Sequence, residues 1–161
     1  MESYKIEISV QTMAVDESSE ADRALVEMAC AMTQKSYAPY SHFHVGAALR
    51  LADGSIYGGA NQENAAYPVG TCAERSAFFY ASADKPDVAP VAIAIAAKAN
   101  GAFTTHPVSP CGMCRQALLE AEMRHGRPMR VLLYTPDVVH VVGSVKDLLP
   151  MSFDGGELPD D

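Results

Sequence analysis

The chain has 161 residues, of which 48% are hydrophobic and 20% charged, the size and composition of one globular domain rather than of a disordered chain. Twelve Lys and Arg against twenty Asp and Glu give a formal net charge of -8, which repels a phosphate backbone, so we expect no nucleic-acid partner. No apolar run approaches the roughly 20 residues of a membrane helix and the start, MESYKIEISV, lacks the pattern of a signal peptide, so we expect a cytoplasmic protein with no membrane partner.

The expected secondary structure begins with a loosely attached arm over residues 1–17. Residues 19–36 place apolar side chains three and four positions apart, which predicts an amphipathic helix with Ser19 as its N-cap. Later apolar runs bounded by turn residues predict strands, and longer stretches predict helices. In chain order, we expect strands at 44–51 and 55–62, a helix at 71–83, a strand at 90–97, a helix at 111–125, and strands at 129–136 and 138–145.

This order predicts one domain over residues 18–153. Strands that alternate with helices are typical of parallel crossovers, with the helices packed on a sheet. We therefore expect the α/β class, as a three-layer α/β/α sandwich around a five-stranded mixed sheet. The last residues, 154–161, read DGGELPDD and are expected to form an acidic tail.

Four cysteines stand at positions 30, 72, 111 and 114. They could pair as two disulfides, but the C-x-x-C spacing indicates metal or redox chemistry in a chain without a secretion signal. Cys72 and the Cys111–Cys114 pair each stand at the start of a predicted helix, where unpaired N–H groups and the helix dipole favour a thiolate. Three such ligands are typical of a catalytic zinc site, whose fourth position is left to water. Glu74, two residues after Cys72, is the expected proton shuttle.

Two other interpretations of the cysteines stay open on the residues alone. A redox pair at Cys111 and Cys114 would also stand at a helix start, but it leaves Cys72 and Glu74 unexplained. A structural four-cysteine site would need Cys30, which lies among apolar residues of the first predicted helix, where a buried inert thiol is usual.

Cys72-Ala73-Glu74-Arg75, followed by Pro110-Cys111-Gly112-Met113-Cys114, resembles the zinc motifs of the cytidine deaminase superfamily. The resemblance runs in order from residue 37 to residue 153, through YAPYSHFHVGAAL, NQENAAYP and LLPMSF. It implies a cytidine deaminase-like fold in which Zn²⁺ is held by Cys72, Cys111 and Cys114, with Glu74 as the catalytic residue. Three cysteine ligands resemble the short-chain, homotetrameric branch of the family.

The same resemblance implies how a nucleoside substrate is bound. It places the Phe43 ring against the pyrimidine and aims the backbone N–H of Ala73 at the carbonyl oxygen of the base. Asn61 and Glu63 are implied to bind the ribose hydroxyl, a role that suits an amide next to a carboxylate.

Further implications concern the assembly and the surroundings of the site. Tyr67 and Phe153 are implied to reach the active site of a neighbouring subunit, in a homotetramer with shared sites. Arg75 is expected to offset the negative charge of three thiolates. His44 and Gln62 stand where a proline and an apolar residue are more usual, so the preference among cytidine, deoxycytidine and modified analogues is left open.

The implied activity is zinc-dependent hydrolytic deamination of cytidine, with 2'-deoxycytidine as a further substrate, to uridine and ammonia in pyrimidine salvage. Water adds to C4 of the base, while Glu74 protonates N3 and then the leaving amino group. Alternatives are a deaminase of a modified nucleoside or other amino-heterocycle and a non-catalytic zinc-stabilised binding module. The net charge of -8 disfavours a deaminase that edits nucleic acid.

Overall fold

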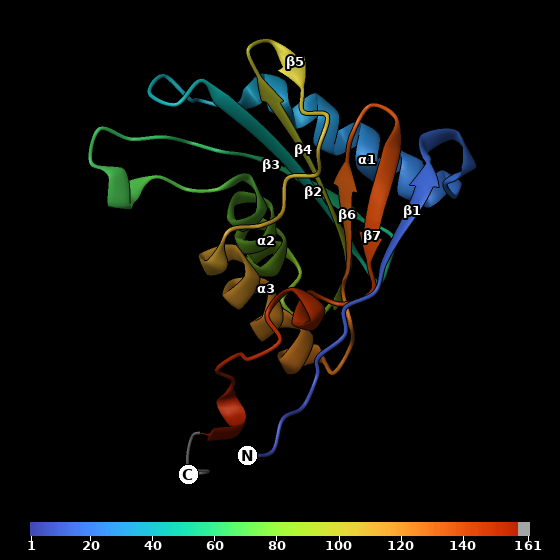
Figure 1. Cartoon of the computed structure of the whole chain (residues 1–161). Helices are drawn as coiled ribbons and strands as arrows, with labels where there is room; N and C mark the ends of the chain where they lie inside the picture. Colours follow the sequence, from blue (N-terminus) through green and yellow to red (C-terminus); the bar gives the residue numbers. More distant parts are fainter. Residues whose placement is uncertain (158–161) are drawn as a thin grey trace.

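The structure, a computed structural model, describes residues 1–157 as a twisted sheet with helices packed on it (Figure 1). The helices are α1 (Glu20–Met32), α2 (Ala73–Asp84) and α3 (Gly112–His125). The strands are β1 (Val10–Ala14), β2 (Phe43–Leu51), β3 (Ile56–Ala60), β4 (Pro90–Ala99), β5 (Ala102–Phe103), β6 (Arg130–Tyr134) and β7 (Val138–Val142). Short 3₁₀ turns occupy Val15–Glu17, Thr33–Lys35, Tyr67–Val69, Val145–Leu148 and Gly155–Glu157.

The sheet has seven strands within the described residues, in the order β1-β7-β6-β4-β2-β3, with β5 paired to β4. β4 and β6 are parallel, and the other pairs are antiparallel. The prediction of a mixed α/β fold is confirmed, but the predicted number of five strands is wrong. The additional strands are β1, which lies inside the expected arm, and β5, which has two residues.

Both additional strands depend on features that a hydrophobic pattern does not contain. β1 pairs with β7 near the other end of the chain, beginning with Val10 opposite Val142. β5 turns back on β4 through Asn100 and Gly101, whose φ angles are 52° and 80°, and is too short to show a period of two.

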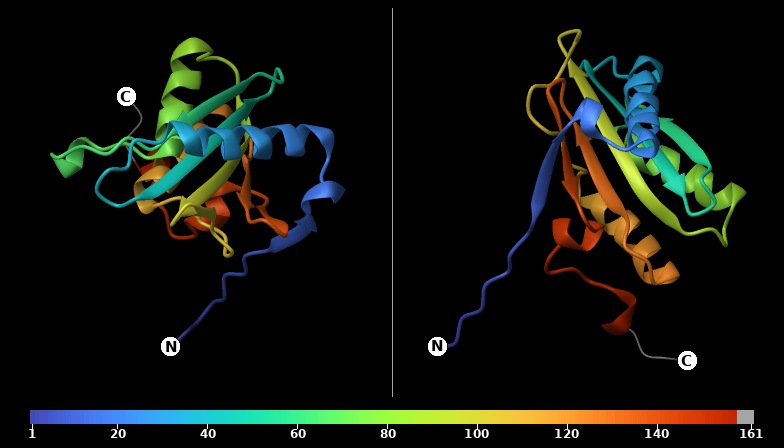
Figure 2. Two further views of the ribbon diagram at one scale, coloured as in Figure 1. Left: turned by 90° about the horizontal axis from the view of Figure 1, so that it is seen from above. Right: turned by 90° about the vertical axis from the view of Figure 1, so that its right-hand side faces the viewer.

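The helices cover both faces of the sheet, with α1 on one face and α2 and α3 on the other (Figure 2). Leu25 of α1 belongs to the same apolar core as Ala48 of β2. Ala77 of α2 and Leu118 of α3 belong to a second core with Leu49, the next residue of β2. Neighbouring residues of one strand therefore face opposite cores, as the alternation of a pleated strand requires, and the fold has three layers.

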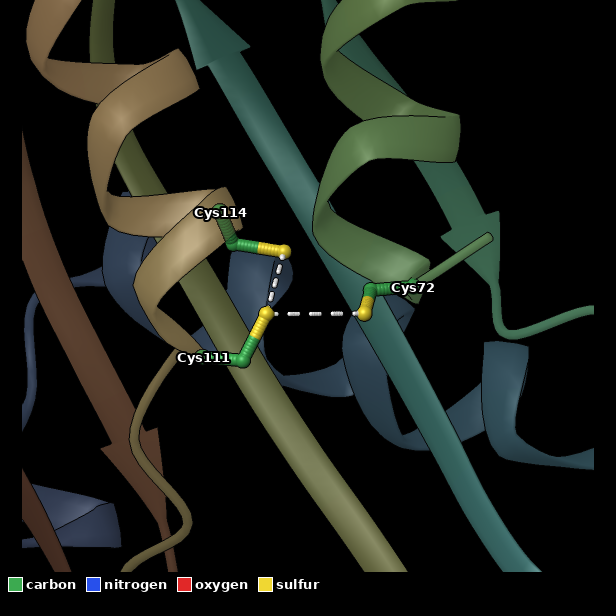
Figure 3. A group of neighbouring side chains, drawn as sticks. All are labelled: Cys72, Cys111 and Cys114. Atoms are coloured by element: carbon green, nitrogen blue, oxygen red, sulfur yellow. Dashed lines mark hydrogen bonds between the residues drawn. The ribbon is translucent and has the colours of Figure 1, made fainter. Parts of the chain in front are cut away.

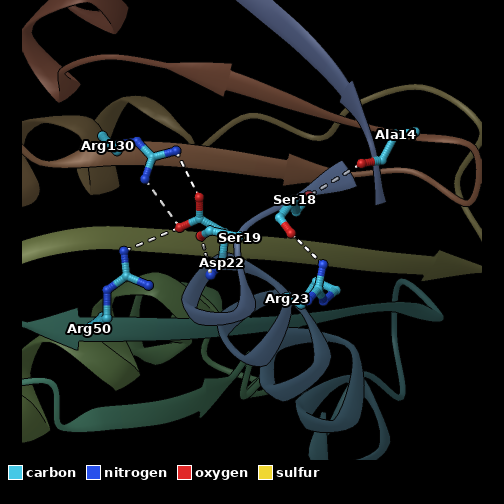
Figure 4. Close-up of polar contacts among 7 residues, drawn as sticks. All are labelled: Ala14, Ser18, Ser19, Asp22, Arg23, Arg50 and Arg130. Atoms are coloured by element: carbon cyan, nitrogen blue, oxygen red, sulfur yellow. Dashed lines mark hydrogen bonds and ion pairs between the residues drawn. The ribbon is translucent and has the colours of Figure 1, made fainter. Parts of the chain in front are cut away.

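A buried charge cluster fixes the start of α1 to the sheet (Figure 4). Asp22 is 4% exposed, and its carboxylate accepts hydrogen bonds from Arg130 at 3.0 and 3.1 Å and from Arg50 at 3.2 Å. The predicted N-cap is confirmed, because the Ser19 hydroxyl oxygen accepts a hydrogen bond from the Asp22 N–H at 3.1 Å. Since Arg50 lies in β2 and Arg130 in β6, the cluster joins α1 to two strands.

The start of the chain lies away from the sheet. Residues 1–9 form an extended segment that leads into β1 (Figure 2). The predicted tail at 154–161 lies partly outside the described residues, and the division of the chain at residues 18 and 153 stays a prediction. A membrane crossing would need a longer and more apolar helix than any formed by residues 1–157.

Candidate active site and metal centre

Two helix N-termini bring the motif cysteines together. Cys72 is the N-cap of α2 and Cys111 the N-cap of α3, which confirms the predicted helix starts. Neither side chain accepts a capping hydrogen bond, so both sulfur atoms remain available as ligands. Cys114 lies in the first turn of α3, on the same side of the helix as Cys111.

The three sulfur atoms form one group between α2 and α3 (Figure 3). Sγ of Cys111 lies 3.8 Å from Sγ of Cys72 and 3.5 Å from Sγ of Cys114. Sulfur atoms about 2.3 Å from a tetrahedral zinc ion would lie about 3.8 Å apart, so the spacing and the thiolate donors fit zinc. Cys114 is buried, Cys72 half-buried and Cys111 exposed, so the group is accessible from one side.

The thiols differ in how readily they ionise. A hydrogen bond from the Cys114 thiol lowers the pKa of Cys72, whereas the partial burial of Cys72 raises it. Hydrogen bonds from Cys111 and the Arg75 guanidinium lower this pKa further, so the net shift is downward. The bond between Cys114 and Cys72, together with burial, raises the pKa of Cys114. Negative charge therefore gathers first on Cys72. The Arg75 guanidinium interacts with both Cys72 and Cys114, so its positive charge faces the cluster.

Glu74 is buried in the first turn of α2, beside the sulfur group. Its exposed fraction is 5%, and this burial raises the pKa of Glu74 to about 7, with a further contribution from the negative charge of Cys72. A carboxyl group with a pKa near neutrality can both take up and release a proton, which is what a proton shuttle requires.

A pocket of about 490 Å³ opens beside Cys72. It is lined by Tyr40, Ser41, Asn61, Gln62, Glu63, Asn64, Tyr67, Gly70, Thr71 and Cys72. The size suits a small-molecule ligand. The pocket therefore places Asn61, Glu63 and Tyr67, which were predicted to bind substrate, next to a predicted metal ligand.

The turn before β2 orients Glu63. Oε2 of Glu63 accepts hydrogen bonds from the N–H groups of Tyr40 at 2.9 Å and Ser41 at 3.2 Å, and the Ser41 hydroxyl donates to Oε1. These bonds, the Ser41 hydroxyl foremost, lower the pKa of Glu63. Glu63 is therefore a carboxylate at neutral pH, able only to accept hydrogen bonds from a ligand.

The other predicted binding residues occupy different places in the fold. Phe43 is half-buried at the start of β2, and strand alternation directs it to the face covered by α2 and α3. Ala73 is fully buried as the first residue of α2, so its N–H belongs to those without an intrahelical partner. Tyr67 is 76% exposed at the pocket rim, whereas Phe153 is 62% exposed and lines a separate hollow.

Sequence reasoning missed Tyr40 and Ser41, whose backbone N–H groups hold Glu63. No residue type marks a backbone N–H that will bind a carboxylate. Cys30 lies in α1, on the opposite face of the sheet from the sulfur group, and all four cysteines are free. The four-cysteine and disulfide interpretations are therefore excluded.

Comparisons with known proteins agree with this geometry. Residues 19–126 match the family described as the cytidine and deoxycytidylate deaminase zinc-binding region. The cytidine deaminase of Halalkalibacterium halodurans is 48% identical over 97 residues, which cover 60% of this chain and 68% of that protein. The probable cytidine deaminase of Dictyostelium discoideum is 34% identical over 125 residues, 78% of each chain.

Solved structures give the same result. The crystal structure of cytidine deaminase from Burkholderia pseudomallei has a TM-score of 0.68 and 41% identity, covering 81% of this chain and 97% of that one. Cytidine deaminase from Mycobacterium tuberculosis has a TM-score of 0.65 and 29% identity, covering 85% and 99%. With three converging cysteines and a buried glutamate at its helix ends, the chain belongs to the cytidine and deoxycytidylate deaminase family and is a hydrolase of the cytidine deaminase type.

Proposed function

We propose that this enzyme hydrolyses cytidine, and 2'-deoxycytidine as a further substrate, to the corresponding uridine and ammonia in pyrimidine salvage. The observation that carries the proposal is the position of Glu74, buried beside three converging cysteines, one of which, Cys72, lines a pocket together with Asn61 and Glu63. The relatives that the chain resembles are named cytidine deaminases.

The proposed metal is zinc, held by Cys72, Cys111 and Cys114. Three thiolates suit this borderline-soft ion, and the exposed side of the group leaves room for a fourth ligand. When bound, zinc activates a water molecule as the nucleophile. Arg75 offsets part of the negative charge that the thiolates bring.

Glu74 moves the protons of the reaction. Its carboxylate accepts a proton from the attacking water and delivers it to N3 of the cytosine ring, as water adds to C4. It then takes up the proton of the new C4 hydroxyl and delivers it to the amino group, which leaves as ammonia while the C4 carbonyl of the product forms. The burial that raises the pKa of Glu74 to about 7 keeps this carboxyl close to balance between its two forms, so it can serve both steps.

Asn61 and Glu63 bind one ribose hydroxyl from two sides. Glu63 can only accept, so the hydroxyl donates to it. The Asn61 amide Nδ2 uses one of its two hydrogens on the Phe43 carbonyl, so its second hydrogen is available to the hydroxyl oxygen. The Phe43 ring packs against the pyrimidine, and the Ala73 N–H binds the carbonyl oxygen of the base.

A homotetramer with active sites shared between subunits completes the proposal. Phe153 and Tyr67 are aromatic and largely exposed in the single chain, at 62% and 76%. Such rings are suited to close a neighbour's site, where stacking on a base adds to burial and water is excluded from the reaction.

A substrate panel tests the function. Purified protein is incubated with free nucleosides and bases, while ultraviolet absorbance, ammonia and bound metal are measured in parallel. We expect about one zinc per chain and release of ammonia from cytidine. Ammonia from another amino-heterocycle but not from cytidine would show that the substrate is assigned wrongly.

A further inference from the structure

Three polar side chains meet behind the pocket wall at Asn61. The Ser36 hydroxyl donates to Oδ1 of Asn61 at 2.5 Å, and Oγ of Ser36 lies 3.2 Å from Nδ1 of His44. All three side chains are half-buried. Ser36 and His44 line a separate cavity of about 340 Å³, so the hydrogen-bonded chain joins that cavity to the pocket.

Backbone groups decide which way the Asn61 amide faces. The Val45 N–H donates to Oδ1 at 2.8 Å, and Nδ2 donates to the Phe43 carbonyl oxygen at 2.9 Å. A flipped amide would place N–H against N–H and oxygen against oxygen, so a single orientation satisfies both strand groups. Oδ1 then accepts two hydrogen bonds, and one hydrogen of Nδ2 remains for a ligand.

The same reasoning locates the hydrogens of Ser36 and His44. Because Oδ1 of Asn61 can only accept, the Ser36 hydroxyl hydrogen is committed to it. Oγ of Ser36 must therefore accept from His44, which requires a hydrogen on Nδ1. In the neutral ring this is the Nδ1–H tautomer, with Nε2 unprotonated.

His44 and Gln62, the two residues that depart from the usual family sequence, both contact the segment Lys35–Ser36. His44 contacts the Ser36 side chain, and Nε2 of Gln62 donates to the Lys35 carbonyl oxygen at 3.2 Å. Their shared position next to Asn61 ties these departures to the ribose side of the pocket rather than to the metal.

We propose that Ser36 and His44 are positioning residues for the ribose of the substrate, acting through Asn61. They hold the Asn61 amide so that its remaining N–H can donate to the oxygen of a ribose hydroxyl. That hydroxyl donates its own hydrogen to Glu63. The inference rests on the proposed function, since it takes a nucleoside as the ligand. Neither residue touches the reacting atoms, so the effect falls on substrate binding rather than on the chemical step.

Kinetics on two nucleosides test the proposal. Cytidine is compared with 2',3'-dideoxycytidine, which lacks both secondary ribose hydroxyls. The loss of one uncharged hydrogen bond predicts that Ser36→Ala lowers kcat/KM for cytidine about fivefold through KM, while kcat/KM for the dideoxy compound changes less than about twofold. His44→Ala should act in the same direction with a smaller effect.

Matched variants separate positioning from general damage. Ser36→Thr keeps a hydroxyl and should restore the preference for cytidine. Gln34→Ala removes an exposed side chain from the same cavity and should leave both nucleosides unaffected. Equal losses on the two nucleosides in Ser36→Ala, or no loss on either, would overturn the proposal.

Nitrogen NMR of the histidine rings tests the hydrogen-bonded chain without turnover. We expect His44 in the full-length protein to show a protonated Nδ1 and a bare Nε2 where the ring is neutral, and to lose this pattern in Ser36→Ala. A neutral ring with its hydrogen on Nε2 would contradict the chain of bonds. If the wild type deaminates no nucleoside, the proposed function fails on that result alone, and the ring spectra still decide the geometry.

Discussion

Gly59 of β3 lies directly against Ala73, the first residue of α2. A Cβ atom added to Gly59 would lie 2.4 Å from the Ala73 carbonyl oxygen and 2.4 Å from the Ala77 backbone nitrogen. The absence of a side chain at Gly59 therefore sets how closely α2 approaches the sheet. Since Cys72 and Glu74 stand at the same end of α2, this contact also sets how deeply the proposed metal ligand and the proposed proton shuttle lie.

Gly59→Ala is expected to destabilise the protein and to weaken zinc binding. Both short contacts are with backbone atoms, so α2 has to shift, at a cost of about 1–3 kcal/mol. Denaturant unfolding and zinc titration measure the two effects. Gly143→Ala is the matched control, because its nearest outside atom is a side-chain oxygen 4.0 Å away. Equal stability of the two variants would contradict the close packing of α2 on β3.

Cys72→Ala should lose zinc and activity together, because two remaining thiolates leave the ion short of its ligands. Metal analysis after preparation without chelator is the measurement. Cys30→Ala is the control and should keep its metal, since Cys30 lies on the other face of the sheet. A Cys72→Ala protein with about one zinc per chain would move the metal site elsewhere.

Glu74→Gln should retain fold and zinc but lose turnover. General acid–base catalysis contributes roughly 10²- to 10⁴-fold, and Glu74 is proposed to serve several proton transfers, so the loss should reach at least that range. Single-turnover kinetics with cytidine, alongside metal analysis, measure it. Near-normal turnover with a full complement of zinc would remove Glu74 from the mechanism.

Asp22→Asn should destabilise the fold by about 2–3 kcal/mol, because it leaves Arg50 and Arg130 without their buried counter-charge. Arg130 is partly exposed, so the loss of stability should be smaller than for a fully buried ion pair. Burial alone would raise the pKa of Asp22, but the hydrogen bonds and charges of Arg130 and then Arg50 hold it below its ordinary value of 3.8. The contribution of Asp22 is therefore complete above that value and is lost as the pH falls through the lower pKa of the folded state.

Urea unfolding over a series of acidic buffers checks both statements about Asp22. The free energy of unfolding of the wild type should fall towards that of Asp22→Asn at the most acidic pH. A difference between the two proteins that does not change with pH would show that the charge of Asp22 contributes nothing.

Phe153→Ala should raise KM for cytidine while leaving zinc content unchanged, because the ring is proposed to close a neighbour's site. Sedimentation of the wild type should show a tetramer. Met151→Ala is the control, since Met151 is 79% exposed two residues earlier and has no proposed contact with substrate. A fully active monomer would show that each site is complete within one chain.

Local sequence patterns predicted the candidate metal ligands and the helices on which they lie. The spacing of Cys111 and Cys114 on one helix, and of Cys72 and Glu74 at the start of another, is a property of neighbouring residues. Capping and periodicity act over the same few positions, so the helix starts could be predicted and are confirmed.

The sequence by itself therefore determined the family of the protein and the type of site, with its cysteines and its glutamate, because these residues lie in short motifs of neighbouring positions. Only the tertiary structure decided that β1 joins the sheet beside β7 and that Ser36 and His44 meet Asn61. Ser36 and Asn61 are 25 positions apart in the chain, and their hydrogen bond has no periodic signature. Such contacts arise when distant segments pair, and a one-dimensional pattern does not record which segments do so.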